Sequence, residues 1–202
     1  MAGRPREFDR DEALEKARNL FWRRGYEAIS FADLQAELRL APARIYAAFG
    51  SKEDLFRAAV DHYRNKEGGF ASRALAEEPT AHGAIERLLR DAVSSFYLPG
   101  RPLGCMVVSA ATNCAKSNEG VLHWLAELRL ERIEAIADRL RDGITAGELR
   151  PETDVQVLAD YYAAMLNGLS VQARDGVPKR RLLAFIPQAM KLLEANLAEP
   201  IA

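Results

Sequence analysis

The segment APARIYAAFGSKEDL, residues 41–55, predicts a short helix that ends directly before a second one. Pro42 suits the first helical position because its missing N–H would have no partner there. Ile45 and Phe49 are spaced i, i+4 and predict the face that points inward, and Gly50 predicts the end of the helix. Because a helix of about two turns is unstable alone in water, neighbouring helices must support it.

Capping signals on both sides of this segment predict the supporting helices. Helices are expected over residues 9–25, 30–38 and 51–63, because each range begins with Asp or Ser followed three residues later by Asp or Glu. The first two and the helix at 42–49 form a three-helix unit. Two short helices joined by a tight turn, the second carrying small and basic residues, are typical of a DNA-binding helix-turn-helix.

Longer helical segments with few breaks follow after residue 66. They are expected at about residues 85–97, 105–116, 121–144, 154–174 and 179–197. No alternating run of β-branched residues is long enough to predict a strand. We therefore expect an all-α fold of about nine helices, with a helix-turn-helix domain at 1–50 and a fourth helix that leads into a larger bundle at 51–202.

The charge balance limits the kind of DNA contact that is possible. With 28 basic and 29 acidic residues and a pI near 6.3, the chain cannot coat nucleic acid through bulk charge, so any contact must be local. No apolar run follows Met1, which predicts neither a signal peptide nor a membrane span and places the chain in the cytoplasm. Cys105 and Cys114 are too few for a disulfide framework, and their nine-residue spacing on one helix would put them on opposite faces.

The helix at 42–49 carries the predicted DNA contacts. Its outward alanines can approach base edges and contact a thymine methyl, and Arg44 can make bidentate bonds to guanine. Tyr46 and Lys52 are expected to contact phosphates, and Ser30 is placed for the same contact. The expected DNA-binding residues are Ser30, Ala41, Pro42, Ala43, Arg44, Tyr46, Ala47 and Lys52.

Several of these basic and aromatic side chains have a second interpretation. Arg44 could instead pair with Glu37 or Asp54 on the surface. Tyr46 could pack its ring within the domain and expose only its hydroxyl. The basic stretch at residues 4–6 is either a tail or an arm that contacts the DNA backbone or minor groove.

Residues 9–64 resemble the DNA-binding domain of the TetR family of bacterial transcriptional regulators. The resemblance rests on Gly25 after the first helix, on the capped helix at 30–38 and on the motif RIYAAFGSKEDLF at 44–56. It implies an all-helical homodimer that represses transcription from a palindromic double-stranded operator. It also implies that residues 51–202 form a ligand-binding and dimerisation domain, in which a small-molecule effector of unknown identity causes release from DNA.

Two residues depart from the family's pattern around the turn. Many relatives have a glycine where Arg39 stands, and a serine that caps the next helix where Ala41 stands. The turn is therefore expected either to contain Arg39 in the left-handed conformation or to be reshaped.

The C-terminal part resembles the family in two shorter stretches. PLGCMVVSAATNC at 102–114 resembles a subset with Gly-Cys at the start of the sixth helix, and TAGELRPETD at 145–154 resembles the join before the last two helices. In this interpretation, the last two helices pack against their copies in a partner subunit as a four-helix interface. The expected interface residues are Leu158, Tyr162, Met165, Leu169, Ile186, Met190 and Leu193.

A ligand pocket is expected among the helices of the same bundle, lined by apolar and aromatic side chains with a few polar ones. The alternative for each candidate is a plain core position, because buried aromatics at helical spacing usually only pack. The pocket candidates are Phe96, Cys105, Met106, Ser109, Asn113, Trp124, Tyr161 and Asn167.

Cys105 supports an alternative mechanism. In the first turn of a helix its thiolate would be stabilised by the helix dipole, which predicts a thiol-based redox or electrophile sensor; otherwise it is a small buried hydrophobe. No metal site is expected from Cys105, Cys114 and His123 because their spacings are wide, and no cofactor is expected.

Other classes of function have less support. The sequence lacks a Walker loop, HExxH, GxSxG and a dinucleotide fingerprint, which argues against an enzyme. A non-enzymatic helical interaction protein is the remaining alternative. It would not need an exposed arginine and a phosphate-contacting lysine around a two-turn helix.

Overall fold

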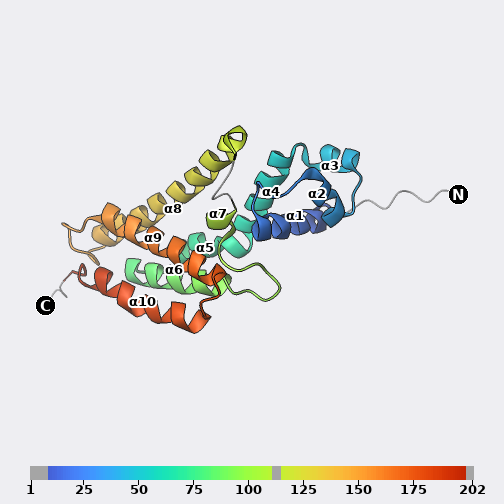
Figure 1. Ribbon diagram of the computed structural model, residues 1–202. Helices are drawn as coiled ribbons and strands as arrows, with labels where there is room; N and C mark the ends of the chain where they lie inside the picture. Colours follow the sequence, from blue (N-terminus) through green and yellow to red (C-terminus); the bar gives the residue numbers. More distant parts are fainter. Residues whose placement is uncertain (1–8, 111–114, 199–202) are drawn as a thin grey trace.

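The computed structural model describes residues 9–110 and 115–198, whose regular structure is helical apart from one isolated antiparallel bridge between Leu149 and Leu197. This confirms the all-α prediction. Figure 1 shows α1–α4 grouped at one end of the molecule and α10 far from them. The elements are α1 (Arg10–Arg24), α2 (Phe31–Leu38), α3 (Pro42–Phe49), α4 (Lys52–Asn65), η1 (Glu67–Gly69), α5 (Phe70–Glu77), α6 (Ala81–Ser95), α7 (Met106–Ser109), η2 (Lys116–Asn118), α8 (Glu119–Thr145), α9 (Val155–Arg174) and α10 (Lys179–Glu194).

The capping residues of the N-terminal helices act largely as the sequence predicts. Ser30 and Ser51 each form a capping box with the aspartate three residues later, at the starts of α2 and α4. Asp9 caps α1 through its side chain. Glu12 differs from the expectation, because its carboxylate pairs with Lys16 at 2.6 Å. These caps satisfy backbone N–H groups that have no partner inside the helix.

An aromatic core holds α3 against its neighbours. The rings of Phe21 and Tyr26 each lie 5.0 Å from the ring of Phe56 on α4, measured between centroids. Ile45 and Phe49, the predicted inward residues of α3, are buried. Each such side chain contributes about 1.5–3 kcal/mol by leaving water, so α3 is stabilised by packing rather than by its own length.

The turn between α2 and α3 contains the predicted departure from ordinary backbone geometry. Arg39 has φ 55° and ψ 39°, the left-handed conformation, and its N–H donates to the carbonyl of Gln35 at 2.9 Å. Ala41 precedes α3 without a side-chain cap. A left-handed residue other than glycine costs roughly 1–2 kcal/mol, so the rest of the domain imposes this turn.

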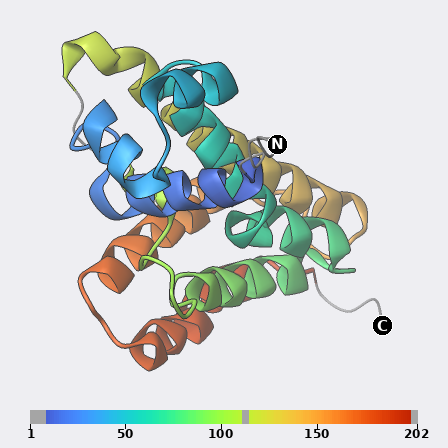
Figure 2. The ribbon, with the colours of Figure 1, turned by 90° about the vertical axis from the view of Figure 1, so that its right-hand side faces the viewer.

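The C-terminal body is a helical bundle in which α6 lies between α5 and α10, and α8 packs along α9 (Figure 2). The sequence prediction missed α5, because Gly68 and Gly69 before it resemble a break. It also started α6 four residues late. Thr80 caps that helix by accepting the N–H of Gly83 at 3.0 Å, and Ala81 is its first residue.

The helix predicted at 105–116 is the largest error in the fold prediction. Within the described part of that segment, only Met106–Ser109 is α-helical, as α7, and η2 (Lys116–Asn118) at its end is a 3₁₀ helix. The carbonyl of Ala110 accepts a hydrogen bond from the N–H of Tyr26 at 2.8 Å. This long-range bond uses a carbonyl that a longer helix would need for its own ladder, and it links α7 to the N-terminal unit.

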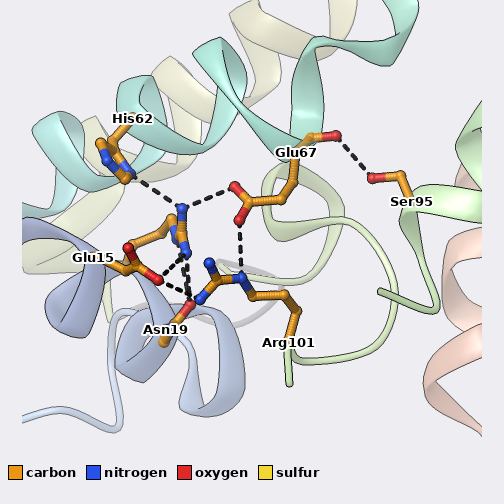
Figure 3. Close-up of polar contacts among 7 residues, drawn as sticks. Glu15, Asn19, His62, Glu67, Ser95 and Arg101 are labelled. Carbon is orange, nitrogen blue, oxygen red and sulfur yellow. Dashed lines mark hydrogen bonds and ion pairs between the residues drawn. The ribbon is translucent and has the colours of Figure 1, made fainter. Parts of the chain in front are cut away.

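A polar cluster joins the N-terminal unit to the body (Figure 3). Arg18 on α1 is fully buried and donates to Glu67 of η1 at 2.8 Å. Arg101, in the loop after α6, contacts the other oxygen of Glu67 at 3.0 Å and also pairs with Glu15 on α1. The carbonyl of Glu67 accepts from the hydroxyl of Ser95 at 2.8 Å. Glu67 therefore connects α1, α6 and the following loop.

Replacing Glu67 by glutamine should destabilise the protein by about 3 kcal/mol, because the change leaves a buried guanidinium without its main counter-charge. Urea unfolding of the full chain measures the loss. The matched control is Glu86→Gln, which removes an exposed pair with Arg90 and should cost about 0.5 kcal/mol or less. Equal losses from the two variants would contradict a special role for the cluster.

Candidate functional site

The surface of α3 presents the residues that the sequence assigned to DNA. Ala41, directly before the helix, and five of its residues are exposed, whereas Ile45 and Phe49 point into the domain. Four of the exposed residues are small, so a groove wall can come close to the helix backbone. The exposed residues are Ala41, Pro42, Ala43, Arg44, Tyr46 and Ala47.

Tyr46 packs its ring against a neighbouring helix and is still exposed to solvent. Its ring stacks on Phe31 of α2, with 4.4 Å between centroids and 13° between planes. The residue is nevertheless 55% exposed. The stacking limits the ring's freedom, so a phosphate contact through the hydroxyl would cost little additional ordering of the side chain.

The acidic residues that compete for Arg44 have contacts of their own. Glu37 lies 3.5 Å from Arg23 on α1, and Asp54 accepts from the hydroxyl of Ser51 at 2.7 Å. Arg44 itself is exposed on α3. Arg44 therefore belongs to the exposed surface of α3, together with Ala43 and Ala47.

Lys52 and Ser30 lie at the starts of the two capped helices beside α3. The ammonium of Lys52 is 4.2 Å from the centroid of the Tyr26 ring, a cation–π contact that orients the half-buried side chain. Ser30 donates its hydroxyl to Asp33, and this bond is the main cause that lowers the pKa of Asp33 to about 2. Asp33 is thus ionised at neutral pH and keeps the cap of α2 intact. The Lys52–Tyr26 contact was not expected, because nothing in the sequence pairs these positions.

Six of the seven predicted interface residues lie in the core of their own chain. All six are buried against the other helices of the bundle, so they have no surface to offer a partner, which corrects the expectation for them. Met165 is half-buried. The six are Leu158, Tyr162, Leu169, Ile186, Met190 and Leu193.

None of the cavities of about 150, 260 and 470 Å³ is lined by more than one of the pocket candidates that the structure describes. Phe96 packs edge to face on Phe70 at 6.0 Å, and Trp124 packs on Phe56 at 6.2 Å. Tyr161 is exposed on α9. Aromatic packing and surface position, rather than a pocket, account for these three residues.

The smaller candidates divide in the same way. Cys105 and Met106 are fully buried, and Asn167 is half-buried on α9. Ser109 donates to the carbonyl of Cys105 at 2.6 Å and lines a separate polar cleft. Asn113 lies outside the described residues. A reactive thiol needs access to its oxidant, so the position of Cys105 gives no support to a thiol sensor.

A cavity of about 150 Å³ lies instead between the end of α4, α5, α7 and α8. The sequence reasoning did not find it because it missed α5, which forms one wall. Apolar side chains and the ring of Tyr63 make most of the lining, and charged residues come from α4 and α8. Residues on its wall include Tyr63, Leu75, Val107, Leu128, Glu131 and Arg132.

The described part of the chain offers neither a cluster of metal ligands nor a membrane-spanning helix. Among residues 9–110 and 115–198, no three metal-ligating side chains come close enough to hold an ion. No helix in the same ranges has the length and apolar content that crossing a bilayer requires.

Comparison with known proteins identifies the family. Residues 13–59 match the family model described as bacterial regulatory proteins, tetR family, and residues 81–182 match that of the tetracyclin repressor-like C-terminal domain. The chain belongs to the TetR family of transcriptional regulators. Members of this family are DNA-binding transcriptional regulators rather than enzymes.

Individual relatives agree with this assignment. The transcriptional repressor ComR of Escherichia coli K12 is 30% identical, with 94% of this chain and 91% of ComR covered. A cysteine mutant of the TetR family regulator CifR, complexed with 26-base-pair operator DNA, is 44% identical with a TM-score of 0.89 over 93% of this chain and 98% of CifR. A TetR regulator from Chloroflexus aurantiacus is 26% identical with a TM-score of 0.81 over 93% and 95% of the two chains.

Arg44 and Lys52 should respond differently to alanine substitution. Arg44→Ala should reduce discrimination at one base pair by about 1–3 kcal/mol, because a bidentate contact to guanine is lost. Lys52→Ala should weaken binding to all DNA about equally and lower the salt slope by about one. Fluorescence anisotropy on a set of single-base operator variants separates the two effects.

The control for both changes is Arg90→Ala, an exposed arginine on α6 that pairs with Glu86. It should leave the affinity and the salt slope unchanged. The same pattern of losses from Arg44→Ala and Lys52→Ala across the DNA set would rule out the assigned roles.

Proposed function

We propose that this TetR family protein represses transcription as a homodimer bound to a palindromic operator, and that a small-molecule effector in the C-terminal body releases it. The observation that carries the proposal is the exposed α3 surface, in which small residues surround Arg44 and Tyr46 on a buried Ile45–Phe49 anchor. Two matching relatives are named as repressors. A protein that acts on the bacterial chromosome would work in the cytoplasm.

The dimer part of the proposal rests on an exposed stripe along α9. Five residues spaced alternately four and three apart are all exposed, which gives one continuous face on the helix. Ala164 and Gly168 in this stripe are small, and a Cβ added to Gly168 would meet no atom within 4 Å, so a second helix could approach closely there. The stripe consists of Val157, Tyr161, Ala164, Gly168 and Val171.

Helix α10 extends this face. Phe185 and Leu192 are exposed and seven residues apart, on the same side of the helix. We infer that the four-helix interface uses these exposed residues of α9 and α10, and that the buried residues on the opposite faces hold each subunit together. A two-fold axis would then bring two α3 helices to successive major grooves of an operator.

Phe185→Glu should shift the monomer–dimer equilibrium towards monomer by at least about tenfold, because it places two charges in an apolar contact. Sedimentation equilibrium measures the shift. Leu130→Glu is the control, since Leu130 is 62% exposed on α8 and lies outside the proposed face. A Phe185→Glu protein that dimerises like the control would exclude this interface.

The repressor part is tested by DNA binding of the full chain. An electrophoretic mobility shift on the DNA that flanks its own gene should show binding that prefers one sequence and weakens steeply with salt. A protein that binds this DNA without sequence preference would remove the support for a specific repressor.

A further inference from the structure

The cavity between α4, α5 and α8 has an unbalanced charge. Arg64 and Glu131 both line it and neutralise each other as an ion pair at 3.0 Å. Arg132 also lines it and is half-buried. Among the described residues no carboxylate oxygen lies within 4.0 Å of a nitrogen of the Arg132 guanidinium. The cavity therefore carries one net positive charge on its wall.

A second arginine strengthens this charge. Arg129 lies three residues before Arg132 on α8, is half-buried, and donates to the carbonyl of Val107 at 3.1 Å. Burial lowers the pKa of Arg129, and the neighbouring Arg132 lowers it further. Two like charges on one helix face repel each other unless an anion lies between or beside them.

Apart from Ser72 and the Tyr63 hydroxyl, the remaining wall residues are apolar. Leu75, Val107 and Leu128 face the cavity, and the ring of Tyr63 closes one side. The cavity measures about 150 Å³, a volume in which a protein interior can hold one benzene molecule. The space thus fits a hydrocarbon group of about six carbons next to a single anionic group.

We propose that this cavity binds a small organic carboxylate, with the carboxylate on Arg132 and the hydrocarbon part between Leu75, Val107 and Leu128. The planar guanidinium can hold both oxygens of a carboxylate through parallel hydrogen bonds. As a statement about the effector, this rests on the proposed function. As a statement about binding, it is independent of DNA.

The position of Tyr63 connects the cavity to the DNA-binding unit. Its ring packs edge to face on Trp22 of α1, with 4.7 Å between centroids. Gly68 also lies against the ring, so close that an added Cβ would lie 2.4 Å from its Cε1. Because the ring contacts both Gly68 and Trp22, a ligand that displaces it must also disturb the packing of α4 on α1.

The test uses isothermal titration of the full chain with benzoate and hexanoate, each compared with its uncharged amide and with inorganic phosphate. Both carboxylates should bind, and benzoate at least about tenfold more tightly than benzamide, because a charge-assisted bond is lost in the amide. Equal binding of benzamide or of phosphate would contradict the proposal, as would no binding of either carboxylate.

Variants locate the site. Arg132→Gln should abolish the preference for benzoate over benzamide, and Arg132→Lys should restore part of it. Arg141→Gln is the matched control, because Arg141 is exposed on the same helix and pairs with Glu134 at 2.9 Å. Should Arg132→Gln fail to fold, the comparison of benzoate with benzamide on the unchanged protein decides. An Arg132→Gln protein that keeps the preference would overturn the assignment.

A separate assay distinguishes this site from the proposed function. Benzoate that binds but leaves operator affinity unchanged would support the carboxylate site and count against its role in release. Operator release by another compound, with no carboxylate binding, would leave the repressor intact and refute the site.

Discussion

The ion pair between the buried guanidinium of Arg18 and Glu67 is the interaction on which the arrangement of the molecule depends. Removing an arginine from water costs several kcal/mol unless its charge and its donors are satisfied. Glu67 supplies the charge and accepts from Nη1, which also lies 3.2 Å from Nδ1 of His62. Asn19 accepts from the other two nitrogens, Nη2 at 3.1 Å and Nε at 3.3 Å. Glu67 belongs to η1 and also binds Arg101. The desolvation cost of Arg18 is therefore offset only when α1, η1 and the loop after α6 are correctly placed relative to one another.

Two hydrogen bonds to backbone carbonyls also lie at this junction. The N–H of Tyr26 donates to the carbonyl of Ala110 on α7, and Arg174 at the end of α9 donates to the carbonyl of Trp22 at 3.2 Å. Helix α9 therefore contacts the DNA-binding unit at one end and presents the proposed dimer stripe along its length. In the proposed dimer, a change in the body that moves α9 or α4 would alter how the two α3 helices are spaced, and a helix-turn-helix dimer depends on that spacing to reach two half-sites.

Local signals predicted the N-terminal unit well. The capping serines and the Ile45–Phe49 spacing depend on a few adjacent residues, so the sequence alone contains them. The left-handed Arg39 is one of two alternatives that followed from the glycine of many TetR relatives at this position. The fold of the C-terminal body depends on which face of each helix is buried, and local sequence patterns do not determine this. Helix α9 has apolar residues on two faces at similar spacing, so periodicity could not separate the buried Leu158 and Leu169 from the exposed Val157 and Val171.

The junction and the cavity were missed for a related reason. Arg18 occurs in a helix rich in charged residues, and nothing nearby marks it as buried. Its partner Glu67 lies 49 positions away, in a turn that was not predicted. The cavity likewise needs α5, which was not expected either. Such features arise from tertiary contacts between segments whose own sequences contain no signal for them.

The most direct measurement of the junction's role is the operator affinity of Glu67→Gln, taken by fluorescence anisotropy at a temperature where the variant is fully folded. Although Glu67 lies far from α3, we expect affinity to fall by about tenfold, a typical size for coupling between sites. Glu86→Gln should bind like the unchanged protein. Full operator affinity in folded Glu67→Gln would contradict the claim that this buried cluster positions α3, the helix proposed to contact DNA.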